Sequence, residues 1–233
     1  MARLRTADED LAPGLRMELL ALGPALVPRL LDLLVAGERG WASVHAVGLL
    51  IDLRATDAIV PLLRVYADEL GMLDEADSDE ARSVRIMVRL PEFGRAALEP
   101  ALAFVAEHVE EDDAVYAAAS VLVRLGIRDD RIFDAIQRVF DVEAILGAGM
   151  FADYGDERGI AVIEGALDRF EPDFSWEWSR ICVADLLHAH EQLGGVVGPA
   201  LRERVDGWFR EWDAHGVTDF LVSCGPRSDR GTS

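Results

Sequence analysis

Apolar residues along this chain recur at spacings of three and four, which places their side chains on one face of an α-helix. Strict alternation of apolar and polar residues, the pattern of a half-buried strand, is almost absent. The pattern therefore predicts an all-α protein. The predicted helices follow one another as pairs at 24–36 and 41–53, 57–70 and 79–90, 96–109 and 113–125, 130–140 and 142–153, and 157–170 and 176–192, between a capping helix at 11–22 and a last helix at 199–214.

A short phrase ending in proline recurs near the start of several first helices. It reads Ala25-Leu-Val-Pro28, Ala58-Ile-Val-Pro61, Ala97-Leu-Glu-Pro100 and Val196-Val-Gly-Pro199. The first three copies are about 33 to 39 residues apart, a period typical of stacked helical pairs. Proline is tolerated in the first turn of a helix, where the backbone N–H has no intrahelical acceptor. A proline placed one residue later, as Pro61 could be after Asp57, would kink the helix.

The second helices hold stretches rich in Ala and Val, such as 43–50 and 115–122. Together with the proline phrases, these stretches make the chain resemble the HEAT-repeat family, including its bilin-lyase-type HEAT-like subgroup, over about residues 22–214. The resemblance implies an all-α, right-handed α-solenoid of about five to six HEAT-like helical pairs. In this interpretation residues 1–21 form an N-terminal cap segment, 22–216 form the solenoid, and 217–233 form a partly disordered tail.

Charge narrows the choice of partner. The 233 residues include 43 acidic and 23 basic residues, a formal net charge of -20, and every basic residue is Arg. Nucleic acid and anionic membranes are bound through clustered Lys and Arg, so neither is expected as the partner. A basic protein is favoured, although the charge could also serve only to keep a repeat protein soluble.

The acidic residues are concentrated in the turns that join a first helix to its second helix. In a stack of helical pairs these turns follow one rim, whereas the opposite turns here mix Arg with Asp or Glu. Acidic residues also stabilise helix N-termini, so capping and solvation remain an alternative to partner binding. We call this set the acidic rim: Asp74, Glu75, Asp77, Asp79, Glu80, Glu110, Glu111, Asp112, Asp113, Asp141, Glu143, Glu171, Asp173 and Glu177.

A second candidate surface is a stripe on the second helices, which line the concave face in the family. Its cations could hold a carboxylate or phosphate, or could be paired with neighbouring acids. Two tryptophans at the fifth second helix could anchor a ligand, or together with Trp208 and Trp212 on the last helix they could cover the end of the stack. The possible ligand contacts are Arg82, Arg85, Arg89, Tyr116, Arg124, Trp176 and Trp178.

No catalytic or cofactor motif is present in the sequence. His188 and His190 lie two apart on a predicted helix and so cannot share a metal ion, and His188 is expected to be partly buried. We expect no metal and no cofactor. Two cysteines form no disulfide framework, and the sequence begins without an apolar leader segment, so a cytoplasmic, membrane-free protein is expected.

These observations favour a non-enzymatic protein–protein interaction module whose acidic rim docks a basic protein. A regulator, an assembly factor and an immunity-type inhibitor are specific forms of this function. The alternative is a HEAT-like enzyme or enzyme subunit, similar to bilin lyases or to alkylpurine DNA glycosylases. The oligomeric state is left open by the sequence.

Overall fold

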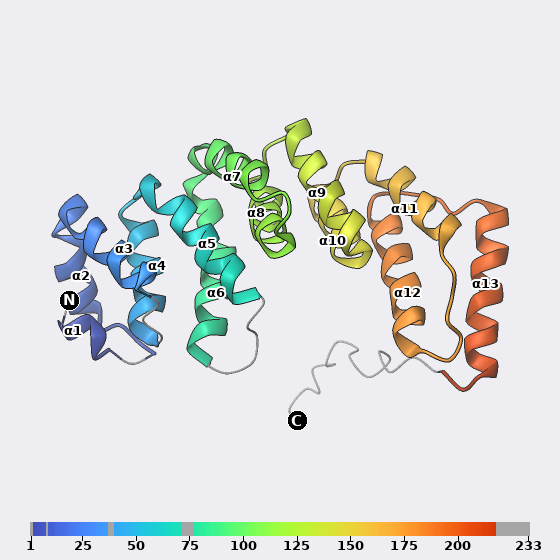
Figure 1. Ribbon diagram of the computed structural model, residues 1–233, viewed down its shortest axis with the longest axis horizontal. Coiled ribbons are helices and arrows are strands. Elements are labelled where there is room, and N and C mark those ends of the chain that lie inside the picture. Colours follow the sequence, from blue (N-terminus) through green and yellow to red (C-terminus); the bar gives the residue numbers. More distant parts are fainter. Residues whose placement is uncertain (1, 8, 37–39, 71–76, 218–233) are drawn as a thin grey trace, which may run out of the picture. The chain divides into compact units, whose positions relative to one another are not determined.

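The computed structural model describes residues 2–7, 9–36, 40–70 and 77–217. The described residues form helices and turns, with no strand among them, which confirms the prediction of an all-α protein. The chain divides into two compact units, residues 1–154 and 155–233, and each is described by itself (Figure 1). Within the described ranges, no helix combines the length and the apolar character needed to cross a membrane.

The first unit follows the predicted helices closely. Its first helices begin after short 3₁₀ turns in three cases, and the second helices follow after polar turns. The elements are α1 (Ala2–Arg5), α2 (Pro13–Leu20), η1 (Gly23–Leu26), α3 (Val27–Val35), α4 (Trp41–Asp52), η2 (Thr56–Ala58), α5 (Ile59–Leu70), α6 (Asp77–Arg89), η3 (Leu90–Phe93), α7 (Arg95–Glu107), α8 (Asp112–Arg124), α9 (Asp130–Val142) and α10 (Ala144–Tyr154).

Each predicted pair packs together, as α3 with α4, α5 with α6, α7 with α8 and α9 with α10 (Figure 1). The first helices α3, α5, α7 and α9 also pack against one another in chain order. The second helices α4, α6, α8 and α10 do the same, and α8 additionally packs against α5 and α9. The first unit is thus built from two rows of helices that share one apolar interior.

Two second helices are buried on nearly every side. In α4 every residue from Ala42 to Ile51 is buried, and in α8 nearly all residues from Ala114 to Val123 are buried. A helix that is apolar all round belongs in a core rather than at a surface. The helix row that the family resemblance places on an open concave face is therefore largely closed at α4 and α8.

The recurring prolines occupy different positions in their helices. Pro28 is the second residue of α3, Pro61 is the third residue of α5, and Pro199 begins α13 (Pro199–Ala214), all within the first turn. The proline inside a helix is therefore Pro100 in α7, and not Pro61, for which the sequence suggested a kink. The missing N–H of Pro100 leaves the carbonyl of Ala96 without its usual helical donor.

The second unit contains α11 (Arg158–Arg169), α12 (Glu177–Gln192) and α13. Trp212 on α13 is fully buried, and its indole N–H donates to the Asp173 carbonyl at 2.9 Å. Phe174 and Phe209 each have ring centres within 6 Å of Trp212, at 5.5 and 5.6 Å. An aromatic cluster therefore fixes the loop before α12 against α13.

Candidate functional site

The acidic rim is described only in part. Asp74 and Glu75 lie outside the described residues, and Asp77 and Asp79 belong to α6 with side chains that also lie outside them. Glu80 is described, is exposed, and takes part in no ion pair among the described residues. The site therefore rests on the turns between α7 and α8 and between α9 and α10.

The acids of the turn between α7 and α8 lie where one helix ends and the next begins. His108, at φ -118 and ψ 32, leaves the helical conformation after Glu107, and α8 starts at Asp112. Glu111 is the extended N-cap residue of α8, but its carboxylate accepts a hydrogen bond from Arg64 at 2.7 Å and does not cap the helix. That bond lowers the pKa of Glu111 and raises the pKa of Arg64.

The other acids of these two turns have no cationic partner among the described residues. Glu110, Asp112, Asp113 and Glu143 are exposed and form neither ion pairs nor side-chain hydrogen bonds there, and none of them caps a helix by a hydrogen bond. Asp141 accepts one neutral hydrogen bond, from the Gln137 amide at 2.9 Å. Asp112 and Asp113 lie in the first turn of α8, where the helix dipole favours them. None of these acids forms an ion pair with an Arg in the part of the chain that the structure describes.

These acids line a groove of about 680 Å³, which we call the rim groove. Asp112 and Asp113 come from α8, Asp141 from α9, and Glu143 from the junction with α10; among the described residues that line the groove, Arg138 is the one cation. Apolar side chains from four helices and the α7–α8 turn complete the lining: Leu70, Val109, Val115, Tyr116, Val139, Val142 and Leu146. The fold thus places carboxylates and apolar side chains from separate turns around one depression.

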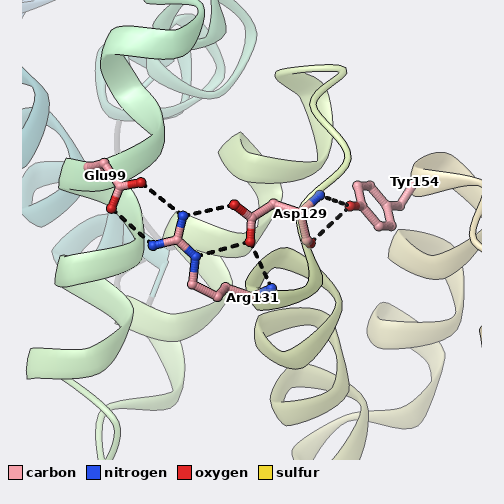
Figure 2. Close-up of polar contacts among 4 residues, drawn as sticks. All are labelled: Glu99, Asp129, Arg131 and Tyr154. Carbon is pink, nitrogen blue, oxygen red and sulfur yellow. Dashed lines mark hydrogen bonds and ion pairs between the residues drawn. The ribbon is translucent and has the colours of Figure 1, made fainter.

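The opposite turns use their acids differently, as the α8–α9 turn shows in Figure 2. The Arg131 guanidinium bonds both carboxylate oxygens of Glu99, at 2.8 and 3.0 Å, and both oxygens of Asp129, at 2.8 and 3.0 Å. Asp129 also caps α9 by accepting from the Arg131 N–H at 3.0 Å. The Arg131 guanidinium, followed by this backbone bond, lowers the pKa of Asp129 to about 2.

Most of the predicted arginine stripe is engaged inside the protein. Buried Arg82 pairs with Glu69 and donates to the Ser43 hydroxyl at 2.8 Å. Arg89 pairs with Asp52 at 3.0 Å and with Glu92 at 2.8 Å, and Arg124 donates to the Ser120 carbonyl at 2.8 Å.

Arg85 is different from the rest of the stripe. It is half-buried and forms no ion pair among the described residues; desolvation lowers its pKa, and neighbouring Arg89 lowers it further. Tyr116, the aromatic residue of the predicted stripe, lines the rim groove together with Asp112 and Asp113. The structure does not gather the stripe into one anion-binding pocket among the described cavities.

In the second unit the predicted site residues divide into structural and exposed groups. Asp173 accepts hydrogen bonds from the Ser175 N–H and hydroxyl, at 2.9 and 2.7 Å, and these bonds lower its pKa. Glu171 and Glu177 have no ion pair among the described residues. Trp176 and Trp178 are 57% and 47% exposed. Trp212 on α13, in contrast, is fully buried.

The histidines of α12 also differ from expectation. His188 is exposed and contacts Gln192, so the expected partial burial is wrong; the buried residue is His190. The Nε2 of His190 lies 3.1 Å from a Glu164 carboxylate oxygen, while its buried Nδ1 has no hydrogen-bond partner among the residues that the structure describes. Within the described residues, no group of three His, Cys, Asp or Glu side chains is placed to hold a metal ion.

Sequence reasoning identified the acids but missed the apolar residues between them. Val109, Val142 and Leu146 are 47%, 61% and 45% exposed although they are apolar. A signal was present, because Val109 and Val142 stand directly beside acidic residues at helix ends. The sequence did show one part of the contrast between the two sets of turns, because Arg stands beside the acids of the opposite turns but not among those of the acidic rim.

Comparisons of the chain with protein-family models, with curated proteins and with solved structures find no match. The function is therefore argued from the site alone.

Proposed function

We propose that this protein is a non-enzymatic protein–protein interaction module whose acidic rim docks a basic protein. In this proposal the two rows of helices are part of a right-handed, HEAT-like α-solenoid of about five to six pairs, and the protein works in the cytoplasm. The partner is a basic protein that it regulates, assembles or, as an immunity-type inhibitor, blocks. The observation that carries the proposal is the set of exposed rim carboxylates that no described Arg neutralises.

The contrast between the two sets of turns supports a binding role for the rim. In the α8–α9 turn the acids stabilise the fold through ion pairs, since Arg131 pairs with both Glu99 and Asp129. Asp112, Asp113 and Glu143 contribute no such pair, so they add to the field around a chain of net charge -20. A field of this sign accelerates association with a cationic partner and selects against anionic ones.

The same observations weigh against a glycosylase-like enzyme. Binding of a DNA backbone needs several available cations on one surface. In the second helices Arg82 and Arg89 are instead engaged with Glu69, Asp52 and Glu92. The interaction module is consequently the better-supported function.

The proposal is tested by affinity capture followed by reconstitution. Proteins retained by the wild-type chain at low salt are identified and purified, and their affinities are measured by calorimetry at about 50 and 300 mM NaCl. A basic protein is expected, with an affinity that falls as salt rises. The rim variant carries Asp112→Asn, Asp113→Asn and Glu143→Gln, and its charge-matched control carries Glu203→Gln, Asp206→Asn and Glu211→Gln on α13.

The rim variant is expected to lose affinity mainly through a slower association rate, while the control retains most of it. Direct partners that are acidic, or that bind the rim variant and the control equally well, would overturn the proposal.

A further inference from the structure

The rim groove is unusual because three large apolar side chains that line it remain in contact with water. We call these three residues, Val109, Val142 and Leu146, the floor of the groove. Val142 at the end of α9 is 61% exposed, Val109 in the α7–α8 turn is 47% exposed, and Leu146 on α10 is 45% exposed. All three line the same groove. Single exposed apolar residues are ordinary, but three that converge on one depression mark a surface that a partner covers.

The charged residues that line the groove, which we call its walls, set a second condition for any occupant, namely its charge. Four carboxylates and one guanidinium line it, from Asp112, Asp113, Asp141, Glu143 and Arg138. None of the four carboxylates has an ion pair among the described residues, and they reach the groove from different helices. An occupant that fills the floor must therefore carry positive charge on either side of its apolar part.

We infer that the rim groove binds one amphipathic segment of the basic partner, with one or two large apolar side chains on the floor and Arg or Lys beside the carboxylates. This inference rests on the proposed function and names the part of the partner that is recognised. Helices that lay an apolar face into a groove are a common mode of peptide recognition.

A segment of a protein fits this groove better than a small molecule does. Pockets for small ligands cover about 70–90% of the ligand surface, whereas the floor here is widely open to solvent. The outer face of a bound segment would be covered by the rest of its own protein. A second copy of this chain is disfavoured as the occupant, because two molecules of net charge -20 repel each other.

The test uses two synthetic peptides of about 12 residues that carry the same positive charge. In the first, pairs of Leu alternate with pairs of Arg; in the second, every Leu is replaced by Ser. Binding of fluorescein-labelled peptide is followed by anisotropy at low salt and at about 0.5 M NaCl. The wild-type chain is expected to bind the first peptide at least about tenfold more tightly, and to keep part of that binding at high salt.

Two variants separate the floor from the walls. Val142→Ser with Leu146→Ser changes only exposed floor residues, and Val35→Ser with Val196→Ser is its control, at positions 76% and 86% exposed. The floor variant is expected to lose the preference for the Leu-containing peptide while binding the Ser-containing peptide normally. The control is expected to behave as the wild type, and circular dichroism verifies that each variant is folded.

The outcomes distinguish the inference from the function on which it rests. Equal binding of the Leu-containing peptide by the floor variant and the wild type overturns the inference but leaves the rim as a general electrostatic surface. Unchanged binding of both peptides by the variant with Asp112→Asn, Asp113→Asn and Glu143→Gln overturns the proposed function itself. The inference and the proposed function are both supported if the floor variant loses the preference for the Leu-containing peptide while its control variant keeps it.

Discussion

The α8–α9 turn and the α7–α8 turn are both acidic, but their carboxylates differ in whether they form ion pairs. In the α8–α9 turn, Asp129 caps a helix and shares Arg131 with Glu99 from a neighbouring helix. In the α7–α8 turn, Asp112 and Asp113 have no cationic partner among the described residues. Acidic composition at a turn therefore does not reveal its role, which depends on whether an Arg lies within bonding distance of each carboxylate.

The largest expected effect on stability comes from the contact between α9 and α10, the helices at the rim groove. A Cβ added at Gly147 on α10 would lie 2.3 Å from the Phe140 Cα of α9. Gly147→Ala must therefore separate the two helices that supply Asp141 and Glu143. We expect a loss of about 3 kcal/mol of unfolding free energy, measured by denaturant titration.

Gly149→Ala is the matched control on the same helix. A Cβ at Gly149 meets nothing within 4 Å, so the better helix propensity of Ala should raise stability, by up to about 1 kcal/mol. Equal stability of the two variants would show that α9 and α10 are not in the close contact described.

The next effect tests the paired side of the comparison. Buried Tyr154 accepts a hydrogen bond from the Asp129 N–H at 2.9 Å and donates to the Asp129 carbonyl at 3.1 Å. Tyr154→Phe keeps the ring under Arg128 but leaves both backbone groups without this partner. We expect a loss of about 1–2 kcal/mol in thermal unfolding, and no change in peptide binding at the rim groove. A variant as stable as the wild type would contradict the account of this turn.

A smaller, pH-dependent effect belongs to Asp129. The pKa of Asp129 in the folded protein is about 2, below its ordinary value near 3.8, because Arg131 bonds the charged form. The folded state is therefore stabilised above pH about 4, and this contribution is lost as the pH falls toward 2. Asp129→Asn should be less stable than the wild type at pH 6 and equal to it near pH 2, as measured by denaturant titration at each pH.

Glu203→Gln, which removes one exposed carboxylate without an ion pair among the described residues, controls for the change in net charge. A stability difference between Asp129→Asn and the wild type that is the same at pH 6 and pH 2 would argue against the Arg131 bond.

The smallest effect on stability is expected at the rim itself. In Asp112→Asn with Asp113→Asn, the lost interaction with the α8 dipole is offset by weaker repulsion within a chain of net charge -20. We expect the thermal midpoint to change by no more than about 2 °C. A much larger loss would mean that these acids serve the fold, and the contrast between the two turns would disappear.

Helix positions were the part of the structure most open to prediction. The periodic apolar pattern located α8, predicted at 113–125 and found at 112–124, because helix ends follow local signals such as Gly126, whose φ is 66. Burial was less predictable. The sequence left open whether the stripe residues Arg82 and Arg89 bind a ligand or pair with acids. Their partners Glu69 and Asp52 come from other helices, and no local pattern identifies them. Glu92, three residues after Arg89, is a partner close in sequence.

The sequence by itself determined that this protein is helical, where its helices begin and end, and where its excess acid is concentrated. These properties depend on residues close together in the chain. Only the tertiary structure decided which carboxylates are neutralised and which remain available. It also brought Val109, Val142 and Leu146 together at the rim groove. Convergence on the groove, and pairs such as Arg131 with Glu99, are contacts between distant segments, so packing of the helices sets them rather than local sequence.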